Sequence, residues 1–305
     1  MKNNKQPKSL FTNDFPQINE NKELKKLFSK YPNYDPYYIA TACIEDRKEL
    51  VDKLWSMYAP YADYSFTKQY KYKDKFHQRT WEMYLGCTLL ENNFHIDNNR
   101  GEGPDFLINN SFYIECTACN NATDKNSPSY VPSLDLRENK IACIDVPENQ
   151  IILRILHAIN SKYKKYKKYL LDKKVDPSLP FIIAINSGIL CHTHLNGYPP
   201  MIIKALFGLE HLQIKYPSGE REYSRWEYVP GDKKYRTDTF TNNYRKEISA
   251  IIYSPNTIIN MPSDIGSDCV IIPNPYAKNP IDISLFPFFK KQNDIMQDIE
   301  DIQFF

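Results

Sequence analysis

Glycine is scarce in this sequence, and no glycine-rich stretch resembles a phosphate-binding loop. Only 9 of the 305 residues are glycine, which excludes nucleotide-binding loops built on closely spaced glycines. Long apolar runs are also missing, since no segment approaches the roughly 18 apolar residues that a membrane-spanning helix needs. The polar, lysine-rich residues 1–14 lack the apolar stretch of a secretory signal. We therefore expect a protein without a membrane partner.

Cysteine spacing and net charge narrow the classes further. The 7 cysteines are an odd number without the spacing of a disulfide scaffold, which favours reduced thiols in a cytoplasmic protein. The net charge is only +2, so any basic surface for nucleic acid must be local. Zinc is the alternative for Cys116 with Cys119, and for Cys191 with His192 and His194. Neither set has a partner pair at zinc-finger spacing, and ordinary thiols and histidines are the better interpretation.

The chain is long and apolar enough to bury a sizeable core. Hydrophobic residues make up 42% of it and aromatic residues 14%, a composition that argues against global disorder. We predict a polar N-terminal arm, a helical extension, a central core, a C-terminal sheet extension and a polar tail, at residues 1–35, 36–77, 78–190, 191–288 and 289–305.

Within the core, helix-like and strand-like patterns alternate. Apolar residues with helical spacing and short β-prone runs between turn residues predict the order α-β-β-β-α-β. The elements fall at 78–91, 94–96, 105–108, 112–117, 148–172 and 181–185. Outside the core we predict helices at 21–30 and 36–58, and strands at 201–207, 212–215, 248–253 and 269–272. The predicted class is α/β with a mixed central sheet, an N-terminal helical extension and a C-terminal strand-rich elaboration.

Two carboxylates converge on the predicted hairpin. Asp105 opens one strand and Glu115 lies near the end of its partner, so antiparallel pairing brings both to one edge. They repel each other unless a cation lies between them. Mg²⁺ or Mn²⁺ suits them, because it takes oxygen ligands and needs few protein carboxylates, and the carbonyl of Cys116 would be a further ligand. Such a metal acidifies a bound water and stabilises charge at phosphorus.

This stretch resembles the PD-(D/E)XK nuclease superfamily, whose restriction-endonuclease-like core has the order αβββαβ. Pro104-Asp105 matches the first half of the motif, and Glu115-Cys116-Thr117 matches the second half except that Thr117 replaces the lysine. Glu82 lies on the preceding helix, where many members carry a further acidic ligand. The resemblance covers residues 78–186, little more than a third of the chain. It implies a metal-dependent endonuclease acting on nucleic acid, DNA rather than RNA, in restriction, defence or mobile-element biology.

Lys162 is the candidate to replace the missing lysine. It lies within an apolar stripe of the helix at 148–172, whereas the lysines at 164, 165, 167 and 168 are predicted to project elsewhere. An inward lysine needs negative partners, which the carboxylates could supply, and some superfamily members similarly carry the lysine on a nearby helix. The stripe comprises Ile151, Ile152, Ile155, Ala158, Ile159, Tyr166, Tyr169 and Leu170. The predicted catalytic set is Glu82, Asp105, Glu115 and Lys162, with Glu82, Asp105, Glu115 and Cys116 as metal ligands.

A second function, from a different class, stays open. Threonine carries no charge at any working pH, so the alternative is a nuclease-like fold that has lost catalysis and binds nucleic acid or a protein. The lysine-rich run at 162–174 could grip phosphates, although a solvated helix face is its simpler interpretation. A homodimer is a further expectation.

Overall fold

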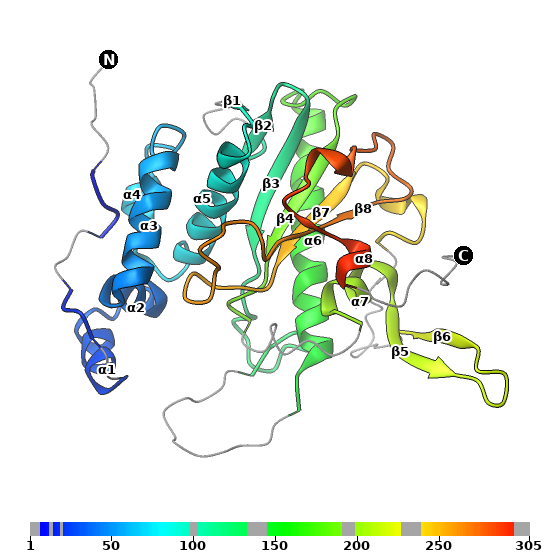
Figure 1. Cartoon of the computed structure of the whole chain (residues 1–305), viewed down its shortest axis with the longest axis horizontal. Coiled ribbons are helices and arrows are strands. Elements are labelled where there is room, and N and C mark those ends of the chain that lie inside the picture. Colours follow the sequence, from blue (N-terminus) through cyan, green and yellow to red (C-terminus); the bar gives the residue numbers. More distant parts are fainter. Residues whose placement is uncertain are drawn as a thin grey trace.

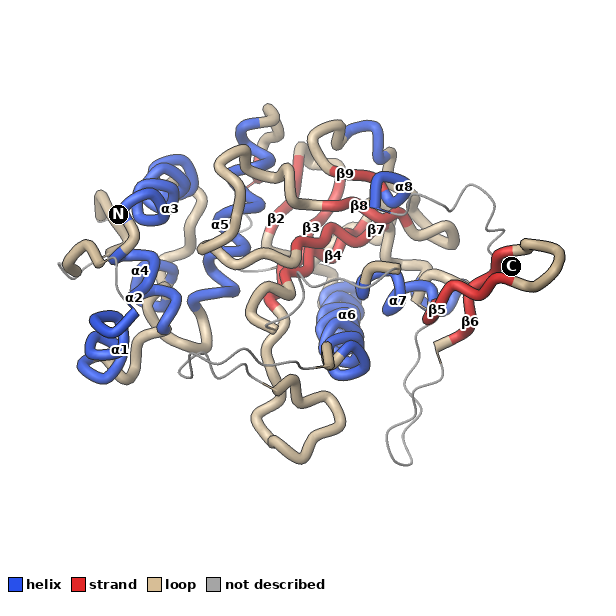
Figure 2. The backbone as a smooth tube through the Cα atoms, turned by 60° about the horizontal axis from the view of Figure 1, so that its bottom comes forward, coloured by secondary structure: helices blue, strands red, loops and turns tan. Residues whose placement is uncertain are grey.

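A mixed seven-stranded sheet forms the centre of the protein. The structure is a computed structural model that describes residues 7–11, 15–18, 21–97, 103–132, 145–190, 199–226 and 239–295. The strands in spatial order are β1 (Ile96–Asp97), β2 (Phe106–Ile108), β3 (Phe112–Ala118), β4 (Phe181–Asn186), β7 (Ala250–Ser254), β8 (Val270–Pro273) and β9 (Lys290–Lys291). Helix α5 (Phe76–Glu91) covers one face of the sheet, and α6 (Glu148–Leu171) covers the other (Figures 1 and 2). The class is therefore α/β, as predicted.

The order of elements predicted for the core is the order observed. β1, β2 and β3 pair antiparallel in sequence, and α6 then connects β3 to β4, which pairs parallel to it. β7 continues the sheet parallel to β4, and β8 returns antiparallel. Phe106 pairs with Ile114, so the register places Asp105, one residue earlier, beside Glu115. Asn109 and Asn110 turn the hairpin with positive φ values of 50° and 51°, which asparagine tolerates better than most residues.

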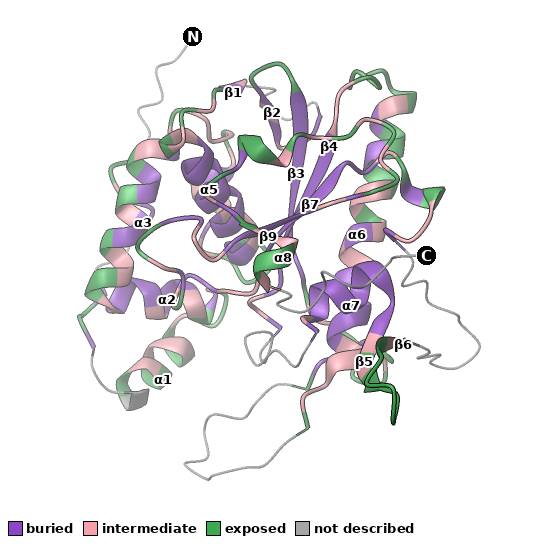
Figure 3. Cartoon of the chain, turned by 45° about the vertical axis from the view of Figure 1, so that its right-hand side comes forward, coloured by how far each residue is buried: buried purple, intermediate pink, exposed green. Residues whose placement is uncertain are grey.

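The central strands are buried on both faces, which explains their nearly continuous apolar sequences. Every residue of β3, β4 and β7 is buried (Figure 3). In β3, Ile114 and Cys116 belong to the core on the α5 side, whereas Tyr113 belongs to the core on the α6 side. Because side chains alternate along a strand, Glu115 and Thr117 face α6.

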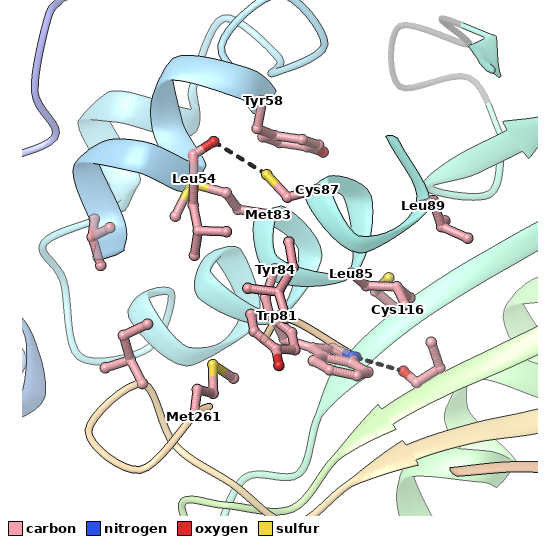
Figure 4. Close-up of a cluster of buried hydrophobic side chains, with 14 of the residues drawn as sticks. Leu54, Tyr58, Trp81, Met83, Tyr84, Leu85, Cys87, Leu89, Cys116 and Met261 are labelled. Atoms are coloured by element: carbon pink, nitrogen blue, oxygen red, sulfur yellow. Dashed lines mark hydrogen bonds between the residues drawn. The ribbon is translucent and has the colours of Figure 1, made fainter. Parts of the chain in front are cut away.

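Helix α5 is enclosed rather than amphipathic. Its residues from Thr80 to Leu89 are all buried, because the sheet lies on one side and α2 (Pro36–Cys43) and α3 (Glu45–Tyr58) lie on the other (Figure 1). The Trp81 indole donates to the Ala184 carbonyl at 3.0 Å, and the Cys87 thiol donates to the Leu54 carbonyl at 3.1 Å (Figure 4). The helical spacing of apolar residues at 78–91 therefore understates how much of α5 is buried.

The N-terminal helices agree with the sequence patterns apart from one interruption. α1 (Asn21–Lys30) matches the helix predicted at 21–30, and the helical region at 36–58 consists of α2 and α3, separated by an extended Ile44. Asp35 starts α2 by accepting a hydrogen bond from the Tyr37 amide at 2.8 Å, as a good N-cap does. The short α4 (Phe66–Gln69) then leads into α5.

One C-terminal strand prediction was wrong. Residues 201–207 form helix α7 (Met201–Phe207), which is wholly buried and ends at Gly208 with a left-handed φ of 65°. A short apolar run buried on all sides has no periodicity that separates helix from strand. The remaining helices are α8 (Gln292–Ile295) and the 3₁₀ turns η1 (Asn243–Arg245) and η2 (Ile283–Leu285).

The other C-terminal strand predictions divide between two sheets. Residues 248–253 and 269–272 correspond to β7 and β8 in the main sheet, whereas 212–215 overlaps β5 (Leu209–Ile214). Among the described residues, β5 pairs only with β6 (Arg221–Arg225), and this hairpin projects from the body of the protein (Figure 1). Within the described residues, no helix is long and apolar enough to cross a membrane.

Candidate active site

Glu115 on β3 is buried and carries two lysine ammonium groups. Its side chain is 0% exposed, and the Nζ atoms of Lys162 and Lys165 both lie 2.7 Å from its Oε1 atom. The Tyr169 hydroxyl lies 3.5 Å from Oε2. The predicted placement of Lys162 beside a carboxylate is confirmed, but the prediction that Lys165 projects elsewhere was wrong. Lys165 follows Lys162 by three residues, so it flanks the same stripe, and its long stem reaches back to Glu115.

Asp105 lies at the edge of the sheet with little to offset its charge. Its Oδ2 atom accepts a hydrogen bond from the Cys116 amide at 2.7 Å, and this is its only hydrogen-bond donor among the residues that the structure describes. Burial, followed by the negative charges of Glu115 and Glu82, raises the pKa of Asp105 to about 8, although the two lysines act in the opposite direction. The hairpin therefore brings Asp105 and Glu115 together, as predicted.

Glu82 lies close enough to influence Asp105, but its carboxylate is already engaged. Its Oε2 atom is 3.0 Å from Arg79, and its Oε1 atom accepts from the Tyr58 hydroxyl at 2.9 Å. Burial raises the pKa of Glu82, and the charge of Arg79 opposes this shift. The approach of Tyr58 depends on Gly86, because a Cβ at that position would come within 2.6 Å of the Tyr58 ring.

Gln78 is a residue at this site that the sequence did not single out. Its Nε2 atom donates to the Cys116 carbonyl at 3.1 Å, and its Oε1 atom accepts from the Ala118 amide at 2.9 Å. β3 extends beyond the start of β2, so its backbone groups there need other partners. The Gln78 amide meets that need and links the start of α5 to β3.

The oxygen donors at this site fit a divalent cation, although fewer of them are free than expected. Within the described parts of the chain, no three or more His, Cys, Asp or Glu side chains are arranged to hold a metal ion. Both Glu82 oxygens make short contacts, at 2.9 Å and 3.0 Å, whereas Oε2 of Glu115 has only the 3.5 Å contact with the Tyr169 hydroxyl among the described residues. Glu115 is therefore the more available of the two, and Glu82 as a direct ligand stays a prediction. The Asp105 and Glu115 carboxylates and the second lone pair of the Cys116 carbonyl remain, and Mg²⁺ or Mn²⁺ often binds through one or two carboxylates. Burial, and then the nearby carboxylates, raise the pKa of Asp105, and a bound cation would lower it again.

Cys116 and Cys119 do not form the alternative zinc site. Cys116 packs in the core on the α5 side of the sheet, whereas Cys119 packs in the core on the α6 side. Two thiols on opposite faces of a sheet cannot share one tetrahedral metal ion. Cys191, His192 and His194 lie outside the described residues.

A row of exposed lysines leads away from Glu115 along α6. Lys164, Lys165 and Lys168 are exposed, and so are Lys173 and Lys174 just beyond the helix.

No known protein identifies this chain by similarity. It matches no protein-family model, no curated protein and no solved structure. The function of this chain must therefore be inferred from the site itself.

Proposed function

We propose that the protein is a metal-dependent nuclease of the PD-(D/E)XK type, with a restriction-endonuclease-like core. The observation that carries this proposal is the contact of 2.7 Å between Lys162 and Glu115, with Asp105 hydrogen-bonded to the next residue of the same strand. A lysine beside two carboxylates at the edge of a mixed sheet is the arrangement that the resemblance implies. In this protein the lysine comes from helix α6, whereas Thr117 occupies the usual lysine position on β3.

Each residue of the site has a distinct role in phosphodiester hydrolysis. Water adds to phosphorus, one P–O ester bond breaks, and the leaving oxygen takes up a proton. Asp105, Glu115 and the Cys116 carbonyl would hold Mg²⁺ or Mn²⁺, which acidifies bound water and offsets charge at phosphorus. Lys162 stabilises the negative charge that develops on the phosphoryl oxygens. Gln78 fixes the Cys116 carbonyl, and the Arg79–Glu82 pair anchors α5 beside the site.

Nucleic acid is the substrate that the surroundings favour, and the resemblance implies DNA rather than RNA. The exposed lysines of α6 begin at Lys165, directly on the candidate catalytic carboxylate, and continue through Lys168 and Lys164. A row of lysines beside a phosphate-cleaving site can neutralise the neighbouring phosphates of a strand. Because of this placement, we favour phosphate binding by these lysines over the simpler interpretation of a solvated helix face.

A nuclease assay tests the proposal directly. Supercoiled DNA, linear DNA and RNA are incubated with the full chain while Mg²⁺ or Mn²⁺ is titrated against EDTA. We expect cleavage that requires the metal and that Asp105→Asn abolishes, since this change keeps the side-chain size but removes the charge. Cleavage that persists equally in Asp105→Asn would point to a contaminant and refute the proposal.

One observation favours the alternative of a lapsed nuclease that binds without cutting. Glu115 Oε1 already has two ammonium partners, so the site is partly neutralised by its own lysines. Metal-independent binding of DNA together with no cleavage in Mg²⁺ or Mn²⁺ would make this the better function. A cytoplasmic location accords with both functions, because the described cysteines are free thiols. The homodimer stays a prediction.

A further inference from the structure

The two lysines on Glu115 differ in how firmly the protein holds them. Both ammonium groups are 2.7 Å from the same oxygen, but the Lys162 side chain is 15% exposed and that of Lys165 is 44% exposed. Lys162 lies within the apolar stripe of α6, whereas Lys165 lies at its border, with its Nζ atom 5.4 Å from the centre of the Tyr169 ring. Lys165 can therefore reach water by rotating its side chain, and Lys162 cannot do so as easily.

We propose that Lys165 is a displaceable cation, which neutralises Glu115 in the metal-free protein and leaves it when a divalent cation binds. Lys162 stays in place in both states. The inference rests on the proposed function, because it requires the metal site at Asp105 and Glu115. It adds a means of regulating that site, which the PD-(D/E)XK motif does not include.

The balance of charge decides which lysine moves. Once a metal ion holds both of them ionised, the carboxylates of Asp105 and Glu115 carry two negative charges, which the ammonium groups of Lys162 and Lys165 would already offset. A divalent cation added to this group leaves two excess positive charges in a largely buried space, where such an excess is costly. Release of Lys165 removes one of them, and the released ammonium is already close to water. Release of Lys162 would instead expose part of the apolar stripe.

Amine labelling of the full chain measures this exchange. The protein is treated briefly with an amine-reactive reagent in EDTA and in Mn²⁺, and labelling of each lysine is quantified by peptide mass spectrometry. We expect Mn²⁺ to raise the labelling rate of Lys165 several-fold and to leave that of Lys162 low. Lys168, one turn further along α6 and exposed, is the internal control and should not change.

A matched pair of variants separates this inference from the proposed function. Lys165→Met removes the competing cation and should tighten Mn²⁺ binding several-fold in calorimetry, whereas Lys168→Met should have little effect. If Mn²⁺ binds the wild type but the labelling of Lys165 does not rise, the exchange is refuted and the metal site stands. If Mn²⁺ binds neither the wild type nor Lys165→Met, the metal-dependent function fails, and the exchange fails with it.

Discussion

Two charged clusters lie on the two sides of β3, and they differ in how completely their charges are paired. On the α5 side, Glu82 is bonded through both oxygens, and its partner Arg79 also bonds Asp63 at 2.7 Å. Facing α6, Glu115 has two lysines on Oε1 and a longer, 3.5 Å contact with the Tyr169 hydroxyl on Oε2, while the neighbouring Asp105 has a single amide donor among the described residues. In the first cluster both carboxylate oxygens of Glu82 have close protein partners. In the second cluster some oxygen atoms of Asp105 and Glu115 are still available to a ligand among the described residues.

The difference shows which cluster stabilises the fold and which is available for chemistry. A buried ion pair with every partner present orients the elements that carry it, and its oxygens are less available to a ligand. A carboxylate with a raised pKa next to another carboxylate is typical of a functional site. We therefore assign the Arg79–Glu82 cluster to stability and the Asp105–Glu115 cluster to function.

The largest effect on stability is expected at the α5 cluster. Arg79→Met leaves Glu82 buried without its cation, and breaking a buried pair in this way costs about 3–5 kcal/mol of unfolding free energy. Urea unfolding in EDTA measures the loss. Adding Glu82→Met should recover most of it. Lys165→Met should cost much less than Arg79→Met, because Lys162 still pairs with Glu115. Equal losses at Arg79 and Lys165 would contradict the comparison.

The largest effect on rate is expected at the α6 cluster. Lys162→Met keeps an apolar side chain in the stripe but deletes the charge, and loss of a group that stabilises transition-state charge costs about 2.7–4 kcal/mol, or roughly a hundred- to a thousandfold in rate. Single-turnover DNA cleavage measures it, with circular dichroism to check folding. The double variant with Thr117→Lys should recover part of the rate, because Thr117 faces the same side of β3. Unchanged turnover in Lys162→Met would show that the lysine is structural.

A pH dependence follows from the charge left unpaired at Asp105. Its pKa is raised from 3.8 to about 8, so in that interval the folded state holds a proton that the unfolded state has lost. Unfolding free energy in EDTA should therefore decline as pH rises through the interval and level off above it. Asp105→Asn should remove this decline, whereas Arg79→Met should keep it. A wild-type profile with the same slope as that of Asp105→Asn would contradict the assignment.

A smaller effect is expected from the lysines that extend the α6 cluster. Lys164→Ala and Lys168→Ala should each weaken DNA binding several-fold and reduce the slope of log affinity against log salt by about one. Fluorescence anisotropy with the inactive Asp105→Asn protein measures both quantities. Lys25→Ala on α1, a helix distant from α6 (Figure 1), is the matched control and should leave the slope unchanged.

The smallest effect is expected from a pair outside both clusters. Lys167 contacts Glu247 at 2.6 Å, but its side chain is 47% exposed, and exposed pairs contribute about 0–1 kcal/mol. Lys167→Met should leave the urea midpoint and the cleavage rate near their wild-type values. A loss of stability as large as that of Arg79→Met would show that exposure to solvent does not decide how much these ion pairs stabilise the fold.

The sequence could predict the parts of the site that depend on local pattern. The hairpin register follows from two β-prone runs around Asn109-Asn110, so this pattern alone is enough to bring Asp105 and Glu115 together. The stripe of α6 likewise placed Lys162 inward. The contribution of Lys165 was missed because a helical wheel gives the direction of the Cβ atom and not the reach of a four-carbon side chain.

Other parts depend on tertiary contacts that no local pattern contains. The spacing of three residues between Arg79 and Glu82 is typical of a helical ion pair, but the hydroxyl of Tyr58 and the carboxylate of Asp63 come from other elements. The bonds of Gln78 to β3 arise only because β3 is longer than its neighbour. Helix α7 was predicted as a strand because its burial on all sides erased its periodicity.

Calorimetric titration of Mn²⁺ into the wild-type chain and into Asp105→Ala tests the central claim most directly. It measures whether Asp105 and Glu115 form a metal site, independently of any substrate. We predict saturable binding to the wild type and none to Asp105→Ala, with both proteins equally folded. Equal affinity in the two proteins, or no binding to either, would contradict the account.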